Sequence, residues 1–328
     1  MNCWQIRLHR ILRKKQFWST LAGVVIVGFL SLYAFYIVLW KDSSSTSFYE
    51  LIARIGLGMF LVTSAVYLIV LSMAISGWVW IVGTLSGNWQ WFRHIQIYCA
   101  TTITRRIPGS VWYLFGRIVL YERLHVSRSL TAIASGLEFS MIILGGLLVV
   151  AVTWPIALNQ QTINPLWLIA SLITGILLLN PLTLRVIIRR INHHGQKLDL
   201  NYCHLLAWVV LYAGVWCGGG CILFVLTTTV HPVSWNMLPV SIGVWAMVGL
   251  VATLLSFVPL GVGQELTLTA LLSPYVGTPE ALVIALLMRG VLTINEFVWA
   301  IIVALPGLRE FVQVLREERA ARKLSQSS

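Results

Sequence analysis

The sequence predicts an all-α membrane protein, a polytopic helix bundle of about six full spans and two re-entrant, broken-helix hairpins. Of the 328 residues, 58% are hydrophobic and only 10% are charged, and the mean hydropathy of +0.84 lies well above that of soluble domains. Apolar runs of about 20 residues, the length that a helix needs to cross a bilayer, alternate with short basic clusters. Pro and Gly interrupt two of the apolar regions.

The distribution of charge supports the same class. The chain carries 23 Lys and Arg against 11 Asp and Glu, a formal net charge of +12. Such an excess also occurs in nucleic-acid-binding proteins, but here the basic residues gather between apolar runs, as they do in cytoplasmic loops of membrane proteins. We therefore expect no nucleic-acid partner. The excess predicts a multi-pass topology with both termini cytoplasmic, and contact with the anionic headgroups of the lipid bilayer.

The N-terminal half is predicted to contain three spans and one hairpin. Residues 1–16 combine basic and apolar side chains, as an amphipathic helix on the inner membrane surface does. The segment 91–124 contains Pro108 and Gly109, which interrupt a helix. The spans, of which the first is expected to be an uncleaved anchor, are predicted at Phe17–Trp40, about Leu57–Leu85, and Thr131–Thr153.

The C-terminal half repeats this order. After the apolar run Leu238–Val258 come Pro259, Gly261 and Gly263, and the arm that follows, Gln264–Leu272, is too short to span because a crossing helix needs about 20 residues. A second re-entrant hairpin is therefore expected. The full spans are predicted at Leu166–Leu184, His204–Thr229 and Glu280–Leu305. The basic tail, 306–328, is expected to form a cytoplasmic helix on the inner membrane surface.

The two halves of the transmembrane domain 17–305 predict an inverted repeat. Residues 17–153 start on the inner side and residues 166–305 on the outer side, and each half has spans before and after one interrupted segment. Non-helical backbone persists at membrane depth only where protein or a wet cavity satisfies its polar groups. Transporters with inverted repeats use such interruptions to build a site near the midplane. The order of elements, and not sequence identity between the halves, carries this prediction.

Four ionisable residues within the apolar segments are the first candidates for function. Burying a charge in a bilayer is costly, so Glu138, Glu265, Arg289 and Glu296 need either a structural partner or a functional use. Under the structural interpretation, Arg289 pairs with Glu265 or Glu138 and holds the bundle together. Under the functional one, an aqueous cavity lets the arginine bind a phosphate while a glutamate takes a cation or a proton. Arg289 and Glu296 are two helical turns apart and share a helix face.

The first helix break is preceded by two further candidates, Arg105 and Arg106. One interpretation is that they draw an anionic headgroup into the inner mouth, with Arg117 on the returning arm, because the arginine fork donates two parallel hydrogen bonds to phosphate. The other is that they extend to the membrane interface without a specific ligand. No Ser-His-Asp set, zinc pattern, P-loop or dinucleotide fingerprint occurs. We therefore expect no enzyme activity, no cofactor and no metal site.

Both breaks lie in motifs that resemble one family. Arg106–Trp112, followed by Gly116-Arg117 and Ser127–Glu138, is similar to that family's "iPG…w…gR…l…s…E" stretch. Pro259–Glu265, followed by Arg289, is similar to its "PgGlGv.E…R" stretch. The family is the lysylphosphatidylglycerol synthase/flippase transmembrane-region family, whose members are membrane halves of bacterial aminoacyl-lipid proteins or stand-alone flippase-like proteins. The resemblance covers roughly residues 15–305.

The sequence departs from the family pattern at two places. Glu138 is followed by Phe139-Ser140-Met141, where family members have Arg and a little later Asp. Leu260 stands where Gly is usual, and the spacing from Gly to Glu265 is one residue shorter. Since residues after 305 leave no room for a soluble aminoacyltransferase domain, lipid aminoacylation is not expected.

The resemblance implies a flippase in the bacterial inner (plasma) membrane. Its expected substrate is an anionic phospholipid or a polyprenyl-phosphate-linked sugar, moved between leaflets. Arg105, Arg106 and Arg117 would attract the headgroup, and the midplane site would consist of Glu138, Glu265, Arg289 and Glu296. A second hypothesis is a non-transporting membrane partner or regulator of an envelope-biosynthesis enzyme, a glycosyltransferase or lipid synthase. It predicts that Glu138, Glu265 and Arg289 close on one another in a dry core.

Overall fold

The computed structural model describes most of the chain from Gly56 onward. The described residues are 56–104, 111–122, 124–157, 165–178, several between 180 and 186, 200–254 and 263–326. They form nine α-helices and, within these ranges, no strand. The predicted segments 1–16 and Phe17–Trp40 lie outside the described residues, and so do the helix breaks at 105–110 and 255–262.

Four helices are long and apolar enough to cross a membrane, which agrees with an integral membrane protein. They coincide with four of the predicted spans, and the structure extends each helix at one or both ends. Gly87 ends the first of them, because it adopts φ +70° and donates its N–H to the carbonyl of Gly83 at 2.9 Å. The four are α3 (Leu57–Ser86), α6 (Arg128–Ala157), α9 (Tyr202–Val230) and α12 (Thr278–Gln326).

Shorter helices flank the two predicted breaks. The first pair is α4 (Trp91–Thr104) and α5 (Val111–Glu122), which pack on each other, and the second is α10 (Met237–Leu254) and α11 (Gly263–Val276), which do the same. A helix, a gap and a second short helix are what a broken hairpin predicts. Whether each hairpin is re-entrant stays a prediction, since both turns lie outside the described residues.

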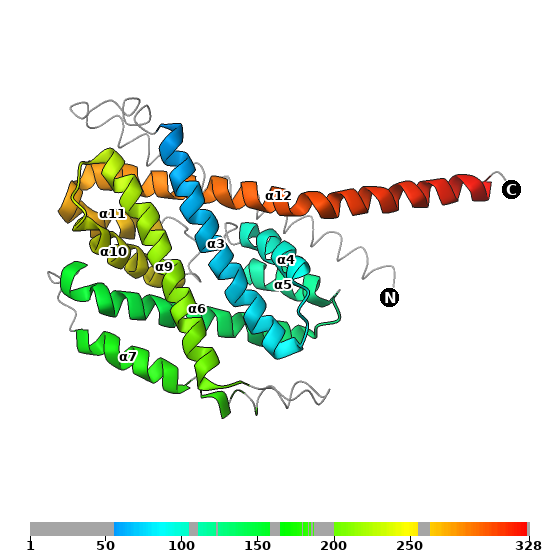
Figure 1. The fold of residues 1–328 in the computed structure, drawn as a ribbon, viewed down its shortest axis with the longest axis horizontal. Coiled ribbons are helices and arrows are strands. Elements are labelled where there is room, and N and C mark those ends of the chain that lie inside the picture. Colours follow the sequence, from blue (N-terminus) through cyan, green and yellow to red (C-terminus); the bar gives the residue numbers. More distant parts are fainter. Residues whose placement is uncertain are drawn as a thin grey trace, which may run out of the picture.

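Two predicted elements differ from the structure in length. The expected span Leu166–Leu184 is represented by α7 (Pro165–Leu178), and Asn180 is not helical. Pro181 explains the interruption, because a residue before proline avoids helical backbone, and Asn180 starts a new turn by accepting the N–H of Leu182 on Oδ1 at 2.9 Å. At the other end, α12 continues past the predicted boundary at Leu305 to Gln326 and projects from the bundle (Figure 1).

The packing of the helices matches between the two halves. The first half is α3 to α6 and the second is α9 to α12. Within each half the first helix packs on the second and fourth, and the second and fourth each pack on the third. Across the halves, α4 packs on α12 as α10 packs on α6, and α3 packs on α12 as α9 packs on α6.

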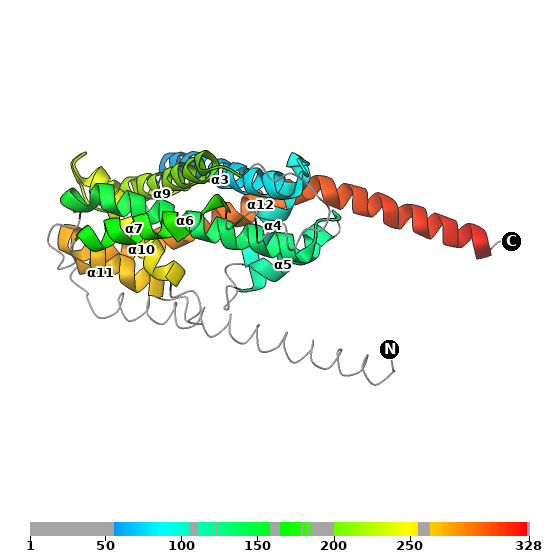
Figure 2. The ribbon, with the colours of Figure 1, turned by 90° about the horizontal axis from the view of Figure 1, so that it is seen from below.

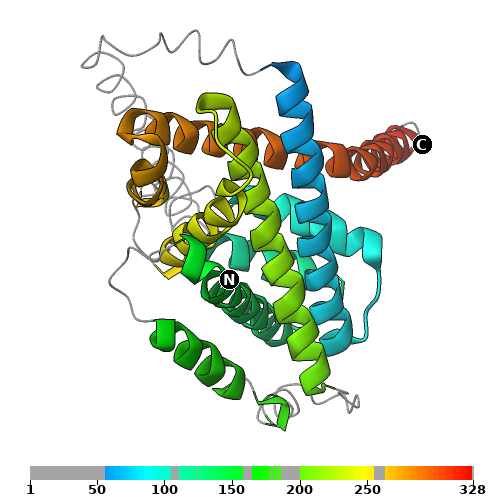
Figure 3. The same ribbon diagram turned by 60° about the vertical axis from the view of Figure 1, so that its left-hand side comes forward.

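The paired helices also run in opposite directions. Helix α3 lies beside α9 and is antiparallel to it, and α6 and α12 likewise point in opposite directions (Figures 1 and 2). Helix α9 lies at the centre, against α3 on one side and α6 and α10 on the other (Figure 3). Matched contacts with reversed direction are what an inverted repeat predicts.

Glycines set how closely α9 approaches its neighbours. A Cβ atom on Gly145 of α6 would lie 2.7 Å from the backbone nitrogen of Ala213, and one on Gly220 of α9 would lie 2.4 Å from the Cα of Ile242 in α10. Such backbone-to-backbone contact is how small residues join membrane helices. It brings the side chains of α9, including Tyr212, against α6.

Candidate functional site

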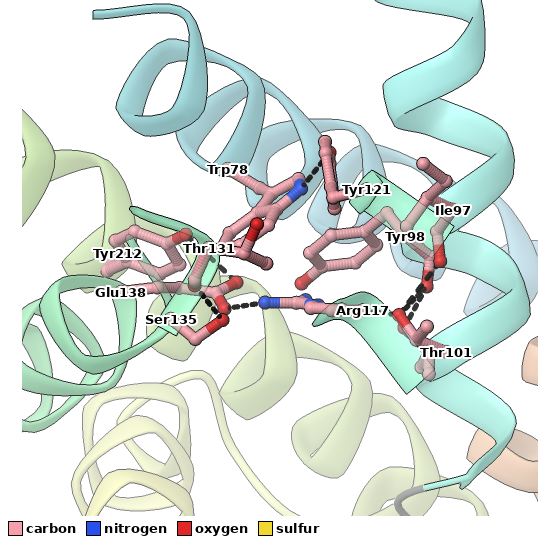
Figure 4. A network of polar contacts seen from close by, with 11 residues as sticks. Trp78, Ile97, Tyr98, Thr101, Arg117, Tyr121, Thr131, Ser135, Glu138 and Tyr212 are labelled. Atoms are coloured by element: carbon pink, nitrogen blue, oxygen red, sulfur yellow. Dashed lines mark hydrogen bonds and ion pairs between the residues drawn. The ribbon is translucent and has the colours of Figure 1, made fainter. Parts of the chain in front are cut away.

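Arg117 on α5, one of the three arginines expected to attract the headgroup, forms an ion pair with Glu138 on α6 (Figure 4). The Arg117 side chain is 0% exposed and that of Glu138 is 1% exposed. The other carboxylate oxygen of Glu138 accepts a hydrogen bond from the Tyr212 hydroxyl at 3.2 Å. This second bond comes from the other half of the molecule, so Glu138 joins α5, α6 and α9.

Aromatic rings enclose the Arg117 guanidinium. Its Cζ lies 3.8 Å from the ring centroid of Trp78, 4.9 Å from that of Tyr98 and 5.4 Å from that of Tyr113. A guanidinium over an aromatic face is attracted by the ring quadrupole, most strongly where water is excluded. Its Nε also donates to Thr101 at 3.4 Å. The first ion pair is therefore a dry, structurally supported contact.

A chain of hydrogen bonds holds Trp78 in place beneath Arg117. The backbone carbonyl of Asn88 can only accept, so His94 must carry its proton on Nε2, which lies 2.9 Å from that oxygen. Nδ1 of His94 then accepts from the Tyr121 hydroxyl at 2.8 Å, and the Tyr121 oxygen accepts from the Trp78 indole N–H at 2.8 Å. Every polar atom in this buried chain has a partner, which orients the Trp78 ring.

Replacing Tyr121 by Phe is expected to lower the free energy of unfolding by about 1–3 kcal/mol, because the buried Trp78 N–H and His94 Nδ1 both lose their partner. Thermal unfolding in detergent, followed by tryptophan fluorescence, measures the change. Tyr202→Phe is the matched control, since Tyr202 is 43% exposed and its substitution should change stability by less than about 0.5 kcal/mol. Equal effects of the two substitutions would contradict a stabilising role for the hydrogen bonds of Tyr121 with Trp78 and His94.

The second ion pair, Glu265 on α11 with Arg289 on α12, is more accessible. The Arg289 Nη1 and Glu265 Oε1 atoms are 2.5 Å apart, and the side chains are 32% and 12% exposed. Glu265 lies in the first turn of α11, where the helix dipole favours a carboxylate. The pair borders a small cavity of about 20 Å³ that Trp245 and Leu292 also line. Of the two partners expected for Arg289, the structure selects Glu265.

A larger cavity of about 230 Å³, which we call the central cavity, lies between α3, α4, α6, α9, α10 and α12. Its wall is mostly apolar and aromatic, with Glu296 as the charged side chain. Trp245 and Leu292 line both cavities, so the two are neighbours. Arg289 and Glu296 share one face of α12, as their spacing predicts, and this face borders the small cavity at Arg289 and the large one at Glu296. The aromatic lining residues are Tyr67, Tyr98, Tyr212, Trp216 and Trp245.

The structure thus distributes the predicted site over two ion pairs and a cavity. Arg117, expected at an inner mouth, lies in the core with Glu138, while Gly263 is the exposed first residue of α11. The sequence interpretation missed Tyr212. A tyrosine in an apolar span needs a partner for its hydroxyl, and this requirement was the available signal. The other predicted residues, Arg105, Arg106, Pro108, Gly109, Pro259 and Gly261, lie outside the described residues.

Comparison with known proteins identifies no family, so the identification stays at the class of integral membrane protein. No family model matches the chain, and no curated protein matches it at a significant level. The described part is all-helical, with four helices of the length and composition that cross membranes. The resemblance to the flippase family accordingly rests on the short motifs alone.

Proposed function

We propose that this protein is a membrane transporter that moves an anionic lipid, either a phospholipid or a polyprenyl-phosphate-linked glycolipid, between leaflets. The observation that carries the proposal is the partly exposed Glu265–Arg289 pair beside the central cavity. An accessible arginine within the apolar part of a membrane protein is unusual, and such residues are found where substrates or ions pass.

The chemistry of the pair suits a phosphate. Arg289 already binds a carboxylate, and its planar fork binds phosphate with the same geometry. A lipid phosphate would compete with Glu265 for the Arg289 guanidinium. Because Glu265 can take the guanidinium back, the lipid can be released as well as bound. The neighbouring cavity of about 230 Å³ has room for a headgroup and not for acyl chains, which would stay in the bilayer.

A second function, a non-transporting partner of an envelope glycosyltransferase or lipid synthase, is favoured by a different observation. The Arg117–Glu138 pair is fully buried, as that hypothesis predicts for the ionisable residues. The non-transporting hypothesis therefore accounts for one of the two ion pairs only. The exposure of Arg289 has no use in a dry scaffold, and for this reason we prefer transport.

Purified protein in vesicles tests the proposal with lipids that carry a fluorescent label on an acyl chain. Dithionite added outside bleaches only the outer leaflet, so the slow phase of bleaching reports movement between leaflets. The protein is expected to accelerate this phase for phosphatidylglycerol or for a short polyprenyl-phosphate sugar. Arg289→Ala is expected to slow it about tenfold, the effect of losing about 1.4 kcal/mol of headgroup binding.

Arg128→Ala is the matched control, because Arg128 also pairs with a glutamate but is 71% exposed and far less constrained. It should transport as the unmodified protein does. Equal rates in vesicles with and without the protein would reject transport and favour the second function. Full transport by both Arg289→Ala and Glu265→Gln would reject the site and leave the function standing.

A further inference from the structure

The two ion pairs occupy equivalent places in the two halves. Arg117–Glu138 joins α5 to α6, and Glu265–Arg289 joins α11 to α12. In each half the pair therefore connects the second arm of the hairpin to the long helix that follows. The polarity is reversed, since the hairpin arm carries the arginine in the first half and the glutamate in the second. We call Arg117–Glu138 the first gate and Glu265–Arg289 the second gate.

The gates differ in state although they correspond in position. Both side chains of the first gate are buried, whereas those of the second gate are 32% and 12% exposed. In transporters built from inverted repeats, one repeat moves against the other around a fixed site to give alternating access. Two halves with matched packing and different exposure of their ion pairs suit one state of such a cycle.

The packing couples the two gates. Helix α10, the first arm of the second hairpin, packs on α6, which carries Glu138. Helix α4, the first arm of the first hairpin, packs on α12, which carries Arg289. A movement of either hairpin thus displaces the helix that carries half of the opposite gate. Packed helices have discrete arrangements, so this coupling favours two states over a continuum.

A pair of tyrosines extends the correspondence. Tyr212 lies ten residues after Tyr202, the first residue of α9, and Tyr67 lies ten residues after Leu57, the first residue of α3. Tyr212 donates to Glu138 and so supports the first gate from the other half. Tyr67 lines the central cavity with Tyr212. A hydroxyl oxygen also accepts hydrogen bonds, so Tyr67 has the chemistry to support Arg289 when the second gate is buried.

We propose that the two ion pairs are alternating gates: the first is shut and the second accessible in this structure, and in a second state the first is accessible and the second shut. The proposal rests on the transport function proposed above. In the second state, Tyr67 holds Arg289 as Tyr212 holds Glu138 here.

Two reporter cysteines test the alternation in a background whose native cysteines are replaced. Position 135 lies one turn before Glu138 and lines neither cavity, whereas position 285 lies one turn before Arg289 and lines the small cavity beside the second gate, so Ser135→Cys and Ala285→Cys are the two reporters. The rate of labelling by a water-soluble maleimide, applied to both faces of the vesicles, reports the opening of each gate. The double variant Arg117→Met/Glu138→Gln removes both charges of the first gate, whose ion pair is the contact that keeps it shut here.

This double variant is expected to raise the labelling rate of Ser135→Cys about tenfold and to lower that of Ala285→Cys, because loss of the first ion pair shifts the population toward the second state. An unchanged or lower rate at position 135, or a raised rate at position 285, would overturn the proposal. Lipid movement is measured in parallel. Alternating accessibility without lipid movement rejects the proposed function and keeps the gates, whereas lipid movement without alternation does the reverse.

A single substitution provides a second test. Tyr212→Phe removes the support of the first gate, so it is expected to raise the labelling rate of Ser135→Cys and to lower that of Ala285→Cys. General loosening of the bundle would raise both rates, and this result would contradict alternation. Tyr202→Phe, at an exposed position of the same helix, should leave both rates unchanged.

Discussion

Replacing Arg117 by Met is expected to lower the free energy of unfolding by about 3–5 kcal/mol, the cost of leaving a buried charge without its partner. Glu138 is 1% exposed, so its carboxylate has no access to water once the guanidinium is gone. The loss of cation–π contact with Trp78 adds to the effect. Thermal and denaturant unfolding in detergent measure the change.

The double variant Arg117→Met/Glu138→Gln is the informative comparison. It removes both charges, and the amide oxygen at position 138 still accepts from Tyr212, so it should recover at least about half of the lost stability. Arg128→Ala breaks an exposed pair and should cost less than about 1 kcal/mol. A double variant as unstable as Arg117→Met would show that packing of the arginine, rather than its charge, is what matters.

Replacing Gly145 by Ala is expected to destabilise the protein by about 1–3 kcal/mol, because the new methyl group would lie 2.7 Å from a backbone nitrogen of α9, at Ala213. Backbone cannot rotate away as a side chain can, so α9 must move from α6. This movement would also separate Tyr212 from Glu138. Unfolding in detergent measures the stability, and the quenching of tryptophan fluorescence reports the separation.

Gly136→Ala is the matched control on the same helix. Outside the adjoining residues and backbone of α6, no atom lies within 4 Å of the position of its new Cβ, so the substitution should be neutral or stabilise α6 by up to about 1 kcal/mol, the difference in helix propensity. Opposite signs for the two substitutions are the expected result. Equal destabilisation by both would mean that glycine matters here for flexibility and not for close approach.

The sequence predicted the elements of the fold better than its contacts. Apolar length alone identified the spans that became α3, α6, α9 and α12, because a bilayer imposes that length on any crossing helix. It failed at Asn180-Pro181, where hydropathy stays high but proline breaks the backbone pattern. Hydropathy measures side chains, and the interruption is a property of the main chain.

Residue type predicted which side chains belong to the candidate site, but the sequence did not predict all of the pairs that they form. Glu138, Glu265 and Arg289 stood out as charges in apolar segments, and Arg289 pairs with one of its two expected partners. Arg117 was expected at an inner mouth with Arg105 because it shares a basic segment with it. Its actual partner, Glu138, is chosen by the packing of α5 on α6, and sequence spacing contains no information on how separate helices pack.

The length of α12 has a mechanical consequence. The helix runs unbroken from Thr278 to Gln326, and the residues after Arg289 extend for roughly 55 Å at about 1.5 Å per residue. Over that length, a small rotation of the helix near Arg289 becomes a much larger displacement at its far end. A rearrangement around Arg289 would therefore also move the part of α12 that lies outside the bundle.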